Sequence, residues 1–158
     1  MPEPRATNRS PTSPAEPRWM CYWLTAAGIY NLVWGAATIA APEFTLRLLG
    51  VNAATNEVWP QLWGCIGMIV GVYGIGYLIA ARNPTRHWPI TLVGLLGKIF
   101  GPIGFVMAAG QGQLPWSMGW TLLTNDLLWW VPFTLILLHA ARVYRRSASA
   151  TPPARTHP

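Results

Sequence analysis

Residues 93–105 read Val93-Gly94-Leu95-Leu96-Gly97-Lys98-Ile99-Phe100-Gly101-Pro102-Ile103-Gly104-Phe105, and this stretch decides the fold. It is apolar enough to cross a bilayer, yet it carries a lysine at its centre. A lone ammonium in hydrocarbon costs at least ~2.5 kcal/mol on insertion scales and is normally buried against a partner. The next apolar stretch supplies an opposite charge, Asp126. We therefore predict a helical membrane protein organised around a Lys98–Asp126 site.

The composition predicts an all-α fold, a polytopic membrane four-helix bundle. Hydrophobic residues make up 52% of the chain and charged residues 10%, against ~25% charged in soluble domains. Four apolar runs, at about 22–41, 62–81, 90–109 and 119–140, are each near the ~20 residues that span a bilayer as a helix. Lipid offers the backbone no hydrogen bonds, and the period-2 alternation of a β-barrel is absent, so these spans are expected to be helices.

The chain divides into a four-helix transmembrane domain, residues 19–146, between two tails, residues 1–18 and 147–158. The tails lack apolar runs and are expected to be disordered. The first span is too long for the apolar region of a signal peptide and lacks a small-residue cleavage site, so we expect it to remain in the mature protein. Residues 44–51 have one apolar helical face and a glycine stop, which predicts a short amphipathic helix in the first outer loop.

Positive charge alternates in phase with the spans. Arginines precede the first span, occupy the loop between the second and third (Arg82 and Arg86), and follow the fourth, whereas the third loop has no charge. By the positive-inside rule, the N- and C-termini are cytoplasmic. We expect a multi-pass protein of the bacterial inner (cytoplasmic) membrane. Its basic tails are expected to contact anionic headgroups of the lipid bilayer, with no nucleic acid as partner.

The sequence assigns no metal site, no catalytic residue and no cofactor. Cys21 and Cys65 fall at opposite sides of the membrane, too far apart for a disulfide. The three histidines are scattered and no zinc-ligand spacing exists. A nucleophile, a metal set or a phosphate cradle that would complete an enzyme site is missing, so the prediction leans away from an enzyme.

Two spans carry glycine stripes with the same 3-4-3 spacing. The glycines are Gly64, Gly67, Gly71 and Gly74 in the second span and Gly94, Gly97, Gly101 and Gly104 in the third. Such stripes let helix backbones approach closely, so we expect helix packing between these two spans. Either an inverted repeat or glycine-driven packing alone explains the shared spacing.

The polar and aromatic residues inside the spans form the candidate polar core or ligand-binding set. They are Lys98, Asp126, Asn125, Asn31, Trp129, Trp130 and Trp34. The tryptophans either pack in the core or provide a platform for a ligand. The polar groups are either a strut that holds the helices in register, or a pocket that binds a headgroup, quinone or small polar molecule or exchanges a proton.

Two prolines are placed to free carbonyl groups near this set. Pro102 removes the amide that would bond the Lys98 carbonyl, and Pro132 does the same for Leu128. We therefore predict a helix kink at each proline and an unpaired acceptor at Lys98.

The motifs resemble a known family. The run Gly97–Phe105, followed by Leu114-Pro115 and by Asn125–Phe133, is similar to small bacterial four-helix integral membrane proteins of unassigned activity. Residues 30–35 and the Leu-Leu-Gly-Val of 48–51 fit the same pattern, and the resemblance covers about residues 22–144. In layout alone the chain is also similar to DoxX-like four-helix proteins, some of which are linked to quinone or thiol redox systems. That likeness transfers no residues.

Three functions remain open. The first is a ligand-binding protein or an accessory subunit of a larger membrane complex. The second is a dimeric small-molecule or proton-coupled transporter, with a homodimer as its working form. The small multidrug resistance proteins carry a glutamate at the level of Asn31, which disfavours drug–proton exchange here. The third is a membrane-embedded redox-linked enzyme, which we place last because a tight Lys98–Asp126 ion pair fixes both groups in their charged forms.

Overall fold

The computed structural model describes residues 16–51 and 58–149, and its regular structure within them is entirely helical. The helices are α1 (Arg18–Ala40), α2 (Pro42–Leu48), α3 (Val58–Ala80), α4 (Trp88–Gly110), η2 (Trp116–Gly119), α5 (Trp120–Leu122), η3 (Leu123–Leu127) and α6 (Leu128–Ser149). The predicted all-α class is confirmed. The predicted tails lie largely outside the described residues, although residues 147–149, expected in the C-terminal tail, belong to α6.

Three helical segments are long and apolar enough to cross a membrane: Val58–Ala80, Trp88–Gly110 and Trp116–Ser149. Helix α1 qualifies only together with α2, and the two are bent by 110°. The described residues therefore contain three such segments, or four when α1 and α2 count as one span. This is the pattern of a multi-pass membrane protein.

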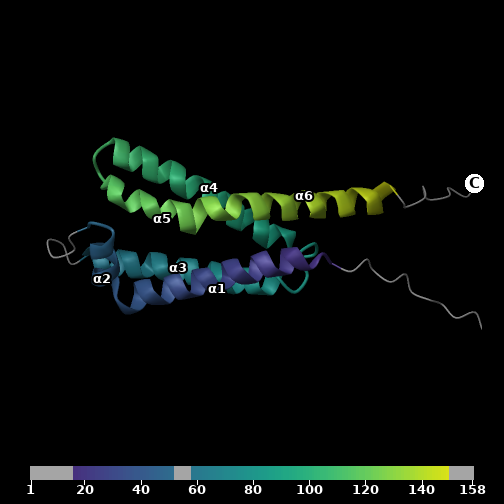
Figure 1. The fold of residues 1–158 in the computed structure, drawn as a ribbon, viewed down its shortest axis with the longest axis horizontal. Coiled ribbons are helices and arrows are strands. Elements are labelled where there is room, and N and C mark those ends of the chain that lie inside the picture. Colours follow the sequence, from purple (N-terminus) through teal and green to yellow (C-terminus); the bar gives the residue numbers. More distant parts are fainter. Residues whose placement is uncertain (1–15, 52–57, 150–158) are drawn as a thin grey trace, which may run out of the picture.

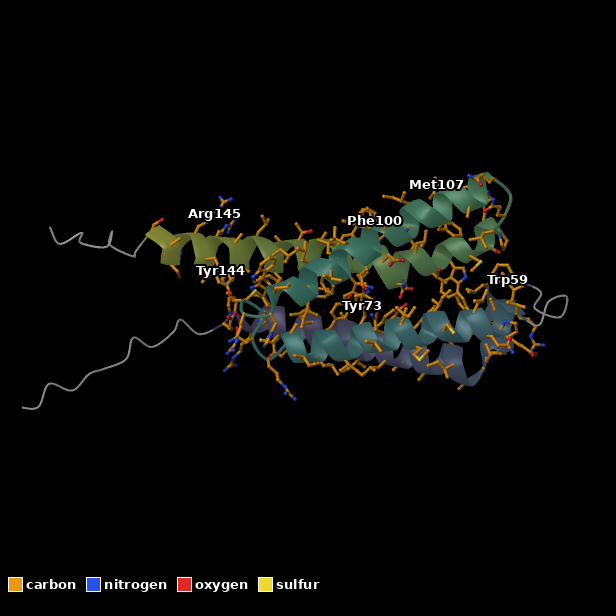
Figure 2. The ribbon with its side chains drawn as sticks, turned by 180° about the vertical axis from the view of Figure 1, so that it is seen from behind. Trp59, Tyr73, Phe100, Met107, Tyr144 and Arg145 are labelled. Carbon is orange, nitrogen blue, oxygen red and sulfur yellow. The ribbon has the colours of Figure 1, made fainter. Side chains whose placement is uncertain are left out.

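The helices form two antiparallel pairs (Figure 1). Helices α1 and α3 lie side by side in one pair, and α4 lies beside α5 and α6 in the other. Contact between α3 and α4 is much sparser than contact within the pair of α1 and α3. Figure 2 shows Phe100 and Met107 of α4 on the outer surface, whereas Tyr73 of α3 lies between the two pairs.

Glycines bring the backbones of α1 and α3 into contact. A Cβ atom on Gly35 would lie 2.5 Å from the carbonyl oxygen of Gly67, and one on Gly28 would lie 2.9 Å from that of Gly74. Gly67 and Gly74 of the α3 stripe therefore pack against α1, whereas a Cβ atom on Gly64 or Gly71 would meet nothing within 4 Å. The structure differs here from the expectation that this stripe packs against the stripe of α4, because α1 carries its own glycines at the matching heights.

A packed core fills the half of the bundle that contains the start of α1. Met20 and Leu24 of α1 meet Tyr77 of α3 and Phe133 and Ile136 of α6 there, and all five are buried. The rings of Tyr77 and Phe133 contact edge to face with their centroids 5.0 Å apart. This core closes the bundle at one half and leaves the opposite half free to hold a cavity.

The substitution Gly35→Ala is expected to lower the free energy of unfolding by about 1–3 kcal/mol, because the new methyl group would push α1 away from α3. The measurement is SDS-induced unfolding in mild detergent, followed by helical circular dichroism. Gly71→Ala is the matched control, since a Cβ atom there meets nothing within 4 Å. Equal stability of the two variants would contradict the proposed close contact between α1 and α3.

Candidate functional site

Pro102 leaves a carbonyl of α4 without its helical partner. It lies inside α4, and its ring nitrogen cannot donate to the carbonyl of Lys98. The indole of Trp130 takes this acceptor, with Nε1 2.9 Å from the Lys98 carbonyl oxygen. The acceptor predicted from the sequence therefore bonds α4 to α6. Pro132 is buried inside α6; a kink at either proline stays a prediction.

A π-helical turn, Leu123–Leu127, interrupts the helix between α5 and α6. Two of its carbonyl groups accept hydrogen bonds from side chains. Trp129 Nε1 donates to the Thr124 carbonyl over 2.9 Å, and Lys98 Nζ donates to the Asn125 carbonyl. Single π turns are rare and occur frequently at functional sites. This one gives the buried lysine a fixed backbone acceptor.

Lys98 and Asp126 lie in one cluster but do not touch. Their side chains are 5% and 7% exposed. No Asp126 carboxylate oxygen lies within 4.0 Å of Lys98 Nζ. The carboxylate receives long contacts of 3.4 and 3.5 Å from Asn125 Nδ2. The structure thus differs from the predicted direct ion pair, because the π turn presents the Asn125 carbonyl to the ammonium in place of the carboxylate.

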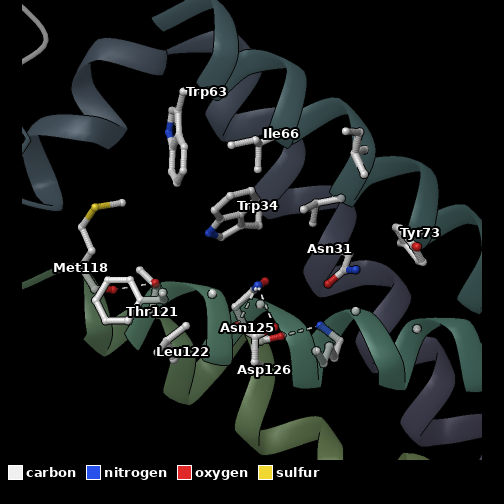
Figure 3. Close-up of a pocket in the computed structure, with 18 of the residues that line it drawn as sticks. Asn31, Trp34, Trp63, Ile66, Tyr73, Met118, Thr121, Leu122, Asn125 and Asp126 are labelled. Carbon is white, nitrogen blue, oxygen red and sulfur yellow. Dashed lines mark hydrogen bonds between the residues drawn. The ribbon is translucent and has the colours of Figure 1, made fainter. Parts of the chain in front are cut away.

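Asn31 brings a further amide from α1 to this cluster. Its side chain is 2% exposed, and its Oδ1 has no hydrogen-bond donor among the described residues. The Oδ1 of Asn125 is buried without a donor as well. Figure 3 shows the amides of Asn31 and Asn125 on facing sides of the same space. Since buried polar atoms are nearly always hydrogen-bonded, the cluster is incomplete as it stands.

The cluster lies on the wall of a cavity of about 430 Å³ between the two helix pairs (Figure 3). Most of the wall is apolar or aromatic, and includes Trp34, Trp63, Ile66, Tyr73, Met118 and Leu122. Its volume falls in the range of ~300–1,000 Å³ that is typical of small-molecule sites. Asn31, Lys98, Asn125 and Asp126 are its principal polar groups.

The glycine stripe of α4 makes room for this cavity. Gly94, Gly97, Gly101 and Gly104 all line it. A Cβ atom on Gly97 or Gly104 would meet nothing within 4 Å, and one on Gly101 would lie 3.9 Å from Asp126 Oδ1. The stripe expected to pack against another helix therefore faces mostly open space over this length. Side chains at Gly97, Gly101 or Gly104 would occupy the cavity, whereas a Cβ atom on Gly94 would collide with the ring of Tyr77.

The three tryptophans of the predicted polar-core or ligand-binding set lie in different surroundings. Trp34 lines the cavity, with its ring centroid 5.4 Å from that of Trp63. Trp129 and Trp130 are not part of the cavity wall. Trp129 packs beside Lys98, whose Nζ is 5.9 Å from the ring centroid, while Trp130 bonds the Lys98 carbonyl. These two residues support the lysine rather than line the space.

Sequence reasoning missed four aromatic residues of the wall: Trp63, Tyr73, Tyr77 and Phe105. The position of Trp63 near a span end is typical of the aromatic belt at a membrane interface, so the sequence gives no separate signal for a place in the cavity wall. The tyrosines gave a usable signal. They lie one helical turn apart in the second half of the predicted span 62–81, with Gly74 between them. A tyrosine hydroxyl at that depth needs a polar neighbour.

Within residues 16–51 and 58–149, no group of three or more His, Cys, Asp or Glu side chains is arranged to hold a metal ion. Cys21 and Cys65 are free thiols. Cys21 is half-buried at the start of α1, and Cys65 is exposed on α3. Neither lines the cavity.

No family model matches the chain, and neither a curated protein nor a solved structure shows significant similarity to it. The chemistry of the site therefore has to be inferred from its own geometry.

The bond from Trp130 to the Lys98 carbonyl should be energetically coupled to Pro102. Trp130→Phe leaves this carbonyl without a donor, which is expected to cost about 1–3 kcal/mol. In a Pro102→Ala background the restored amide can bond the carbonyl, so the same substitution should cost about 1 kcal/mol less. A double-mutant cycle on the free energy of unfolding measures this difference.

Trp120→Phe is the matched control for this cycle, since Trp120 is 55% exposed. Its cost should be the same with and without Pro102. If Trp130→Phe costs as much in the Pro102→Ala background as in the wild type, the proline does not create the acceptor that the indole occupies.

Proposed function

We propose that this chain is a membrane protein that binds a small, largely apolar molecule in the cavity beside Lys98 and Asp126. The observation that carries the proposal is the composition of the cavity wall. Apolar and aromatic side chains form most of it, and the polar groups are gathered in one cluster. Ligand sites have this composition, because apolar surface supplies binding free energy while a few polar groups fix orientation.

The position of the cavity mouth supports a ligand that arrives from the bilayer. Ile66 and Ile69 of α3 line the cavity and are exposed, as are Gly97, Gly101 and Gly104 of α4. Residues that both line a cavity and reach the surface lie at its mouth. The mouth is therefore between α3 and α4, on the flank of two apolar helices rather than at their ends. In a membrane this flank faces hydrocarbon.

A purely structural strut explains the cluster less well. A strut would satisfy its own hydrogen bonds, but Asn31 Oδ1 and Asn125 Oδ1 have no donor. The charges of Lys98 and Asp126 are also held apart rather than paired. A partly satisfied polar network in a low-dielectric interior is costly. A bound molecule that completes these hydrogen bonds would offset that cost.

The proposal includes an orientation in the bacterial inner membrane. The start of α1, the turn between α3 and α4, and the end of α6 carry Arg18, Arg82, Arg86 and Arg142. These segments share one end of the bundle (Figure 1). By the positive-inside rule this end faces the cytoplasm. Helix α2 then lies at the outer surface as a short amphipathic helix.

Cysteine labelling tests this orientation. In a background with Cys21→Ser and Cys65→Ser, a membrane-impermeant maleimide added to intact spheroplasts should label Gln113→Cys and spare Arg86→Cys. After permeabilisation both variants should react. Labelling of Arg86→Cys before permeabilisation would reverse the proposed orientation.

Filling the cavity should abolish binding. The probe is tritiated decan-1-ol, added to the full-length protein in lipid nanodiscs, with partition into protein-free nanodiscs subtracted. Gly97→Leu places a side chain in the open space of the cavity and is expected to weaken saturable binding at least about 10-fold. Val106→Leu is the matched control on the same helix, since Val106 is 51% exposed and does not line the cavity. Absence of saturable binding to the wild type, or equal binding by Gly97→Leu, would refute the proposal.

A further inference from the structure

Lys98 and Asp126 line one cavity without contacting each other. Both side chains line the same cavity wall, yet the ammonium bonds the Asn125 carbonyl and lies more than 4.0 Å from either carboxylate oxygen. Both are almost fully buried, so bulk water does not solvate them. Charged groups in such surroundings need hydrogen-bond partners. The described residues provide fewer partners than these two groups can use.

The site has both hydrogen-bond donors and hydrogen-bond acceptors without partners among the described residues. An ammonium has three donors, and the structure uses one, toward the Asn125 carbonyl. A carboxylate has about four acceptor sites. The only donor to Asp126 among the described residues is Asn125 Nδ2, at 3.4 and 3.5 Å, which is beyond the usual length of an N–H···O bond. Free donors and free acceptors therefore face one space.

Resting on the proposed function, we infer that the ligand carries a neutral hydroxyl group that accepts a hydrogen bond from Lys98 and donates one to Asp126. A hydroxyl is both donor and acceptor. An ether oxygen accepts only, and an ammonium donates only, so each would leave one of the two charges without a partner. The cluster already balances one positive and one negative charge, so an ionic ligand would add an uncompensated charge in a low-dielectric site.

The rest of the cavity defines the body of the ligand. Ile66 and Leu122 provide aliphatic walls, and Trp34 and Trp63 form an edge-to-face aromatic pair. The mouth between α3 and α4 admits a molecule from the bilayer with its chain trailing toward lipid. The ligand class is therefore a membrane-soluble alcohol: an aliphatic or aromatic body with a hydroxyl at the inserted end.

Two isomeric probes distinguish the contribution of the hydroxyl group to binding from that of the apolar body. Decan-1-ol and 1-methoxynonane have the same atoms, but the ether cannot donate a hydrogen bond. Each is used to displace tritiated decan-1-ol from the full-length protein in nanodiscs, with concentrations expressed per lipid so that partition is matched. Decan-1-ol is expected to compete at least about 10-fold better than the ether, because the ether leaves the buried carboxylate without its donor. Undecane, which has no polar atom, should compete no better than the ether.

Substitutions assign the two proposed hydrogen bonds to Asp126 and Lys98. In Asp126→Ala the preference for the alcohol over the ether should fall to about 1-fold, while Glu43→Ala, which removes an exposed carboxylate of α2, should keep the wild-type ratio. If Asp126→Ala does not fold, Lys98→Met tests the bridge from its other side. It removes the donor to the oxygen that the alcohol and the ether share, so it should weaken the binding of both and leave the ether competing no better than undecane.

The outcomes separate this inference from the proposed function. Equal competition by decan-1-ol and 1-methoxynonane, with binding still lost in Gly97→Leu, would overturn the hydroxyl bridge and leave the cavity as a ligand site. Tighter binding of decylammonium than of decan-1-ol would overturn it in favour of a cation. A preference for the alcohol that survives in Asp126→Ala, or decan-1-ol binding that is unchanged in Lys98→Met, would overturn it as well. Failure of every probe to bind saturably to the wild type would refute the proposed function itself.

Discussion

The scarcity of water is the constraint on which this structure depends. Inside an apolar bundle, each backbone or side-chain polar group must find its partner in the chain itself. Two departures from regular helix, at Pro102 and in the π turn Leu123–Leu127, make carbonyl groups available in the interior. The indole of Trp130 takes one and the ammonium of Lys98 takes another. The two irregularities therefore join α4 to α6 with complementary hydrogen bonds.

Glycine has two opposite effects in the same bundle. In α1 and α3 the missing side chains allow backbones to meet, so that Gly35 and Gly67 leave no space between the helices. In α4 the missing side chains at Gly97 and Gly104 are not replaced by a neighbouring helix, and a cavity results. The difference lies in the partner. Helix α1 has glycines that match α3, whereas the α3 surface that faces α4 carries Ile66 and Tyr73, whose bulk keeps the two helices apart.

The sequence was sufficient to predict the helical class and the freed carbonyl of Lys98, because both follow from local chemistry along a helix. The depth of the polar residues in a membrane stays a prediction. Two features were beyond the sequence. The glycine spacing shows which residues share one face of each helix. It does not show which neighbouring helix that face contacts, so the sequence did not determine the partner of either stripe. The π turn adds a residue to one helical turn and shifts the register after it, and a 3.6-residue period does not reveal this. Lys98 bonds the Asn125 carbonyl, which lies inside this turn, and not the Asp126 carboxylate.

Holding two opposite charges close without contact requires rigid support, because attraction in a low-dielectric interior favours their collapse into a pair. The support comes from one turn of helix. Lys98 is tied to the carbonyl of Asn125, and the carboxylate belongs to the next residue, Asp126, so the same backbone fixes both groups. Trp129 packs beside the ammonium with its own indole anchored on Thr124 of that turn. A site in which donors and acceptors are fixed before the ligand arrives loses little freedom on binding. The proposed binding site rests on the separation of Lys98 from Asp126, because a direct ion pair would leave neither group free to bond a ligand.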